Sequence, residues 1–196
     1  TMRNKNELKI VCLGGKDLSR AIKHCKGNLL IADFECILCD FNQRAIDILL
    51  DVLPTMKNLL SFTLNTVMIA ASCDLSQIIE CLGNVKIKTL KILASLHQDQ
   101  QVRSLIRSLP HLRSLCKIKL TFAQIDGDFI RDLYDISVRH LPECLFEVKI
   151  QDEMSIITRR GKENFIHKQF EHILSSQYPS TRVRLFYTKK GIDQDD

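Results

Sequence analysis

The sequence has no long hydrophobic run. Nowhere do about 18 uncharged apolar residues follow one another, so we expect no transmembrane helix and no membrane partner. The apolar segment Leu8–Leu13 near the N-terminus is short and is interrupted by Lys9, unlike the hydrophobic region of a signal peptide.

Charge of one sign is also scarce. The chain has 28 basic and 23 acidic residues among 196, which gives a net charge of +5. This mild excess is compatible with an acidic partner but is too small to indicate nucleic acid by itself. With 45% hydrophobic and 26% charged residues, the composition is that of one folded domain with a sizeable core, and we expect disorder only at the ends.

The eight cysteines do not indicate a disulfide-rich scaffold, because the chain is long for that class of protein. Cys12, Cys81 and Cys144 lie inside apolar periodic segments, where a free thiol packs as a small hydrophobic group. We therefore expect an intracellular protein in a reducing compartment, either the cytoplasm or the nucleus.

One short pattern recurs along the chain: an apolar residue, two residues, an apolar residue, one residue, and a third apolar residue. It occurs at Leu8-Val11-Leu13, Leu29-Ala32-Phe34, Leu59-Phe62-Leu64, Ile87-Leu90-Ile92, Leu115-Ile118-Leu120 and Leu145-Val148-Ile150, and more weakly at Ser180-Val183-Leu185. The spacings between successive first positions are 21, 30, 28, 28, 30 and 35 residues. This near-constant period predicts repeated units that each begin with a strand.

Each predicted strand is followed by a segment with helical spacing of its apolar residues. We expect helices over Gln43–Leu53, Leu75–Leu82, Gln100–Leu109, Phe129–Leu141 and Phe165–Leu174. The first four are preceded by side chains that cap helix starts, namely Asn42, Asp74, Asp99 and Asp126. Helix-breaking residues follow the helices, at Pro54, Gly83, Pro110, Pro142 and Pro179.

The segments Leu115–Ile125 and Leu59–Ile69 resemble the leucine-rich-repeat consensus LxxLxLxxNxL, with Ala123 and Val67 in place of the asparagine. The spacing and the full helix in each unit resemble the ribonuclease-inhibitor-like subclass, which also occurs in F-box proteins and NOD-like receptors. The resemblance implies an α/β solenoid, with a curved parallel sheet of about 6–7 strands and helices on the convex side. The alternative is an ordinary α/β domain with an open parallel sheet.

The resemblance covers roughly residues 8–187. We divide the chain into an N-terminal leader (1–7), a leucine-rich-repeat domain (8–187) and a polar C-terminal tail (188–196). A repeat that starts at Leu8 leaves almost no room for a cap over the first strand, so we expect further protein before Thr1 in the natural sequence.

No motif in the chain indicates catalysis. Cys36 and Cys39 form a lone CxxC without the second ligand pair that zinc requires, and the repeat places them in a strand-to-helix turn. Gly14-Gly15-Lys16 lacks the spacing of a phosphate-binding loop. We therefore expect a protein that is not an enzyme and has no cofactor, no metal and no small-molecule substrate.

Basic residues recur at one position of the repeat. The residue between the second and third apolar positions should face the concave side of the sheet, and in the last four units it is Lys91, Lys119, Lys149 and Arg184. The same position holds Cys12, Asp33 and Thr63 in the first three units. Further basic residues nearby are Lys88, Lys117 and Arg182, and the acidic residues Glu147 and Asp152 interrupt them. Aromatic residues that could lie beside the row are Phe122, Phe146, Phe186 and Tyr187. A simple preference for long polar side chains at exposed strand positions is the alternative explanation.

These observations favour a non-catalytic protein-interaction module whose concave face binds an acidic protein surface. The resemblance further implies part of a larger receptor or of a ubiquitin-ligase adaptor. The expected partner-binding residues are Lys91, Lys117, Lys119, Lys149, Arg182, Arg184, Phe122, Phe146 and Phe186. The alternative function is nucleic-acid binding through the same basic face, although the acidic interruptions disfavour it.

Overall fold

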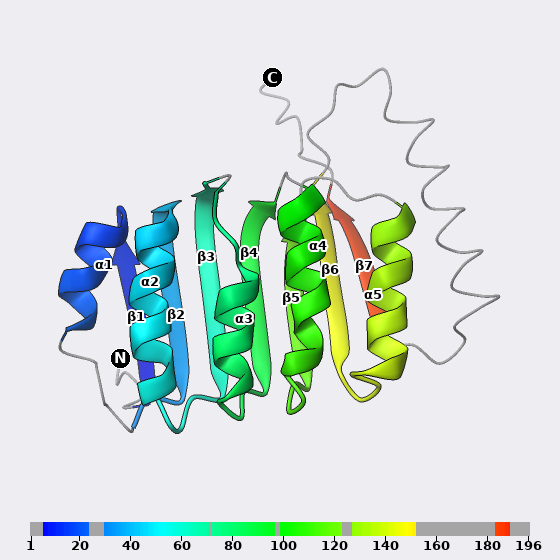
Figure 1. Ribbon diagram of the computed structural model, residues 1–196, viewed down its shortest axis with the longest axis horizontal. Helices are drawn as coiled ribbons and strands as arrows, with labels where there is room; N and C mark the ends of the chain where they lie inside the picture. Colours follow the sequence, from blue (N-terminus) through cyan, green and yellow to red (C-terminus); the bar gives the residue numbers. More distant parts are fainter. Residues whose placement is uncertain are drawn as a thin grey trace, which may run out of the picture.

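The computed structural model describes residues 6–23, 30–70, 72–96, 99–122, 127–151 and 183–188. Seven strands form one parallel sheet in which spatial order follows chain order, from β1 to β7 (Figure 1). The strands are β1 (Glu7–Cys12), β2 (Asp33–Phe41), β3 (Ser61–Ile69), β4 (Thr89–Leu96), β5 (Lys117–Phe122), β6 (Leu145–Gln151) and β7 (Val183–Thr188). The prediction of about 6–7 sequential parallel strands is therefore confirmed.

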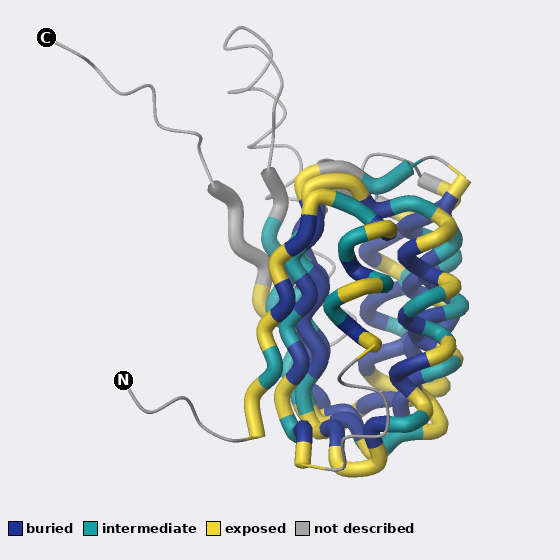
Figure 2. Tube along the Cα trace, turned by 90° about the vertical axis from the view of Figure 1, so that its left-hand side faces the viewer, coloured by how far each residue is buried: buried dark blue, intermediate teal, exposed yellow. Residues whose placement is uncertain are grey.

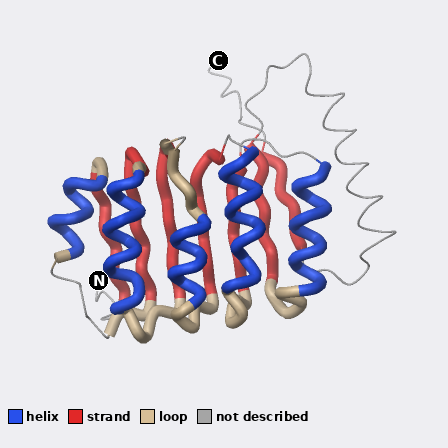
Figure 3. Tube along the Cα trace, in the orientation of Figure 1, coloured by secondary structure: helices blue, strands red, loops and turns tan. Residues whose placement is uncertain are grey.

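A helix follows each of the first five strands, and these helices cover one face of the sheet only (Figures 2 and 3). They are α1 (Gly15–Ile22), α2 (Gln43–Val52), α3 (Ser76–Gly83), α4 (Asp99–Ser108) and α5 (Gly127–Arg139). The short 3-10 helices η1 (Leu53–Thr55) and η2 (Leu109–His111) extend α2 and α4. The opposite face of the sheet carries no helix among the described residues, and we call it the open face.

Several local signals at helix ends act as the sequence predicts, whereas Asp99 and Gly83 lie inside α4 and α3, and Asp126 lies outside the described residues. The Oδ1 atom of Asn42 accepts a hydrogen bond of 3.3 Å from the backbone N–H of Ala45, which satisfies a free donor at the start of α2. Asp74 accepts a bond of 3.0 Å from the N–H of Ser76. Pro54 and Pro110 lie in η1 and η2, between a helix and the next strand. The predicted helix Phe165–Leu174 and Pro179 lie outside the described residues.

Strand pairing gives the repeat a constant length through the centre of the sheet. Residues that pair across successive strands are Phe34, Phe62, Leu90, Ile118 and Phe146, each 28 positions after the last. All five are buried against the helix layer. The rings of Phe34 and Phe62 contact each other, with centroids 5.6 Å apart.

The sequence prediction assigned several strand registers wrongly. In β1, Ile10 and Cys12 are buried, whereas Val11 and Leu13 are 67% and 72% exposed. The predicted register was three residues out in β1, and any odd shift moves every side chain to the other face. In β2 and β6 the predicted register was two residues out, so that the faces were right but the neighbours were wrong.

Cys36 and Cys39 lie within β2 and not in a turn. Their side chains have opposite burial, Cys36 buried and Cys39 exposed.

The buried layer of the protein consists of alternate strand residues and the inner sides of the helices. In the part of the chain that the structure describes, no helix combines the length and apolar composition needed to cross a membrane.

Candidate partner-binding face

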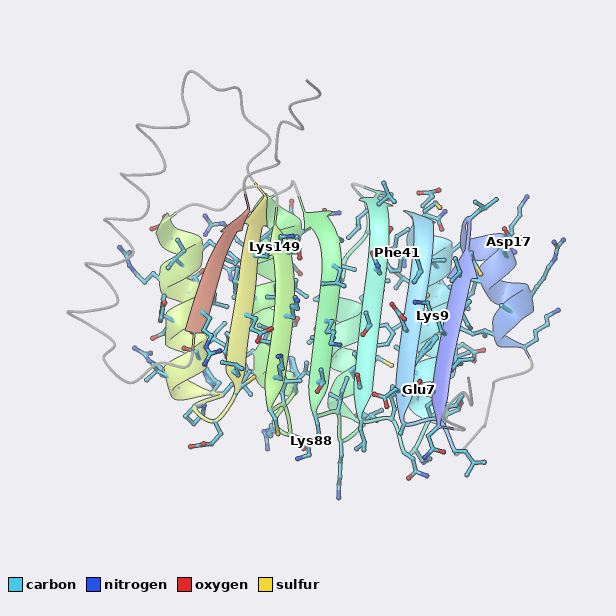
Figure 4. The ribbon with its side chains drawn as sticks, turned by 180° about the vertical axis from the view of Figure 1, so that it is seen from behind. Glu7, Lys9, Asp17, Phe41, Lys88 and Lys149 are labelled. Carbon is cyan, nitrogen blue, oxygen red and sulfur yellow. The ribbon has the colours of Figure 1, made fainter. Side chains whose placement is uncertain are left out.

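The open face is formed by every second residue of each strand, because successive side chains on a strand point to opposite faces. Figure 4 views this face, with Glu7 and Lys9 on β1 near one edge and Lys149 on β6 toward the other. Lys88 precedes β4 and lies at the end of the sheet, not on a strand.

Pairing places one row of mostly charged residues across the middle of the open face. In order from β1 to β7, the row is Lys9, Glu35, Thr63, Lys91, Lys119, Glu147 and Arg184. The prediction that Lys149 belongs to this row is wrong, because Lys119 pairs with Glu147. Lys149 instead pairs with Thr121 and Phe186, two residues further along its strand and on the same face. Asp33, likewise, pairs with Ser61 in the row before.

Glu147 is a carboxylate surrounded by cations. Its Oε1 atom accepts a hydrogen bond of 2.8 Å from Lys117 Nζ. This bond holds the pKa of Glu147 below its ordinary value, and the charges of Lys117, Lys119 and Arg184 act in the same direction against the effect of burial. One acid is thus shared among several bases, which leaves an excess of positive charge around it.

The excess extends over the strands from β4 to β7. We call Lys91, Lys117, Lys119, Lys149 and Arg184 the basic cluster. Lys91 and Lys119 are directly paired on neighbouring strands, about 4.8 Å apart. Among the described residues, Lys91, Lys119 and Lys149 form no ion pair. Like charges that face each other across a strand pair destabilise a sheet, so an external anion would relieve this repulsion.

The other edge of the open face is acidic. Glu7, Asp33 and Glu35 lie on β1 and β2, and Glu35 forms an ion pair of 2.8 Å with Lys9. The open face therefore changes sign across the sheet, from acidic at β1 and β2 to basic at β4 to β7. Sequence reasoning found the basic half but did not notice this contrast.

The predicted aromatic anchors are not all available. Phe146 is completely buried against the helices, so its assignment to the partner-binding face is wrong. Its position in the strand has the parity of the core residue Val148. The side chains of Phe122 and Phe186, and all of Arg182, lie outside the described residues.

Several aliphatic side chains on or beside the strands are exposed. Val11 on β1 and Val67 on β3 are 67% and 73% exposed, and Leu13, which directly follows β1, is 72% exposed. Ile37 and Leu93 are half-buried in the row that pairs with Val11 and Asn65.

A depression lies where the apolar and basic regions meet. Its rim is formed by Asn65, Val67, Leu93, Lys119, Thr121 and Lys149. Two irregularities in the sheet produce it. The β3–β4 pairing stops at Asn65 and Leu93, although β3 continues to Ile69. The β4–β5 register then shifts, so that the segment 93–95 of β4 lies opposite Thr121 alone.

Neither a scan against protein-family models nor a search of curated proteins found a match for this chain. Its function therefore has to be argued from the open face itself.

No group of three or more His, Cys, Asp or Glu side chains among the described residues could hold a metal ion. Burial raises the pKa of the Cys36 and Cys144 thiols to about 12, which keeps both protonated and unreactive.

A second depression lies between α3 and α4 on the helix side, lined by polar residues that include Glu80, Arg107 and His111.

Proposed function

We propose that this chain is a leucine-rich-repeat-like solenoid that acts as a non-catalytic protein-interaction module. The fold assignment is supported by the constant 28-residue period from Phe34 to Phe146 and by the single helix layer. Each strand–helix unit has an apolar face that only its neighbours can bury, as in a solenoid.

The repeats depart from the leucine-rich consensus at the asparagine position. Val67 occupies that position in β3, and its side chain is exposed. The equivalent residue in β2 is Cys39, also exposed, and both strands continue past this point to Phe41 and Ile69. The proposed solenoid therefore has longer strands than the consensus turn would allow.

The proposed partner is a protein with an acidic surface that docks on the open face over the basic cluster. The observation that carries this proposal is the direct pairing of Lys91 with Lys119. The neighbouring acid, Glu147, already accepts a hydrogen bond from Lys117. Such an arrangement is unfavourable in isolation and becomes favourable when carboxylates approach it. A larger receptor or a ubiquitin-ligase adaptor would be a suitable setting for this module.

Nucleic-acid binding through the same face is the second candidate function. It is favoured by the basic cluster and disfavoured by Glu147, Glu35 and Asp33 on the same face, which would repel a phosphate backbone. An extended strand of nucleic acid also needs continuous positive charge, whereas this face changes sign.

A displayed library of random peptides, selected on the intact chain, tests the proposal. We expect enrichment of Asp and Glu in the selected peptides, and loss of binding in the double variant Lys91→Glu/Lys119→Glu. The matched control is Lys57→Glu/Lys86→Glu, which makes the same charge change at exposed residues outside the sheet. The variants should remain folded, because none of the four lysines belongs to the buried core, and substitutions outside it usually change stability by about 0.5 kcal/mol or less.

Two results would contradict the proposal. Selected peptides without acidic residues would exclude an acidic partner. Binding of a single-stranded oligonucleotide that is tighter than that of any selected peptide, and that weakens steeply with salt, would favour the second candidate.

A further inference from the structure

The depression at the centre of the open face combines two kinds of surface. Val67 and Leu93 supply an apolar side from β3 and β4, and Lys119 and Lys149 supply two ammonium groups from β5 and β6. Asn65 and Thr121 add an amide and a hydroxyl that can hydrogen-bond to a carboxylate. Ligand sites are typically concave, with an apolar part and a few convergent polar groups.

The depression is more than a space between surface side chains. Thr66 and Ala94 also line it, and both are almost completely buried, with exposures of 5% and 2%. The depression therefore reaches down to inner residues of β3 and β4, although these stay largely covered. The end of β3–β4 pairing and the register shift in β4 explain the depression. Irregularities of this kind often occur next to functional sites, where they redirect side chains.

The charge of the depression is only partly balanced by nearby groups. Glu147 lies on the same face, but its Oε1 atom accepts from Lys117, on the far side from the apolar residues. In the described part of the chain, no carboxylate lines the depression. A ligand that enters it therefore needs an anionic group for the two lysines and an apolar group for Val67 and Leu93.

We propose that this depression receives a short extended segment of the acidic partner in which an apolar side chain and a carboxylate lie two residues apart. This inference rests on the proposed function and specifies the chemistry of the partner. Neighbouring strands are about 4.8 Å apart, so the apolar and basic sides are separated by about 5 Å between β4 and β5 and by about 14 Å between β3 and β6. Residues two apart on an extended peptide point the same way and are about 7 Å apart, which falls within that range.

The test uses fluorescein-labelled synthetic peptides and the intact chain. The parent peptide is Gly-Ser-Leu-Ser-Glu-Ser-Glu-Ser-Gly, and binding is followed by fluorescence anisotropy. One comparison peptide has Ser in place of Leu. A second has the same composition, with Leu moved by one residue so that it points away from the Glu side chains.

We expect the parent peptide to bind more tightly than both comparison peptides. Lys119→Gln/Lys149→Gln should weaken its binding about tenfold, which corresponds to about 1.4 kcal/mol. Val67→Thr keeps the shape and strand preference of the side chain and should weaken the parent about threefold to fivefold, without affecting the Ser peptide. Matched controls on the helix side are Arg107→Gln and Val138→Thr, which should change nothing.

The outcomes separate this inference from the broader proposal. If the Leu and Ser peptides bind equally and both lose affinity in the lysine variant, the apolar half of the inference is wrong but the acidic-partner function stands. If the parent peptide does not bind while acidic peptides selected from the library still require Lys91 and Lys119, the depression is not the docking point. The inference would also be overturned if an oligonucleotide displaced the peptide equally well from the wild-type chain and from the Val67→Thr variant.

Discussion

Substitution of Phe62 by alanine tests the strand register on which the whole interpretation depends. Phe62 is 1% exposed and its ring contacts that of Phe34 at 5.6 Å. Truncation of a buried phenylalanine to alanine typically destabilises a protein by about 3–5 kcal/mol, because it removes apolar burial and leaves a cavity. The ring contact accounts for about 0.5–1.5 kcal/mol of that loss.

Urea denaturation followed by circular dichroism measures the effect. With a dependence of about 2–3 kcal/mol per M for a chain of this size, the midpoint should fall by about 1–2 M. The control is Val67→Thr, five residues further along β3 but 73% exposed on the opposite face. Its unfolding free energy should stay within about 0.5 kcal/mol of wild type.

Either of two results would refute the register of β3. One is a small loss of similar size in both variants. The other is a larger loss for Val67→Thr than for Phe62→Ala, because a one-residue offset exchanges the buried and exposed residues. A double-mutant cycle of Phe34→Leu and Phe62→Leu isolates the contact, with an expected coupling of about 0.5–1.5 kcal/mol. Strict additivity would show that the rings do not touch in solution.

Two further predictions concern the open face and the thiols. Glu147→Gln removes the acid that the described residues place within the basic cluster and should strengthen binding of acidic peptides; weaker binding would mean that Glu147 itself contacts the partner. The folded-state pKa of Glu147 lies below its ordinary value of 4.5, so its contribution to stability is present above that pH and is lost as the pH falls through the folded-state pKa. The unfolding free energy should therefore fall less steeply with decreasing pH in the Glu147→Gln variant than in wild type. Alkylation of the native protein, followed by peptide mass mapping, should modify the exposed Cys39 and Cys116 first, whereas Cys36 and Cys144 should react only after unfolding. Rapid alkylation of Cys36 in native buffer would contradict the burial of alternate residues in β2.

The sequence alone determined the kind of fold because its signals are local. Apolar periodicity separated strands from helices, Asn42 marked the start of α2, and Pro54, Pro110 and Pro142 marked the returns to the sheet. The near-constant spacing then favoured sequential parallel strands, because units of equal length bury their apolar faces by stacking on their neighbours in the chain. None of these features depends on which residues face each other across two strands.

Only the tertiary structure decided which charges lie together. Lys149 and Glu147 are two residues apart and share the open face, so the pattern of apolar residues fits either of them opposite Lys119. The choice depends on how the β5–α5–β6 connection packs, and this places an acid inside the basic cluster. The depression has the same origin, because it arises where pairing between β3 and β4 ends and where β4 shifts against β5. Strand pairing joins residues 28 positions apart, and a single sequence contains no local signal for where such pairing stops.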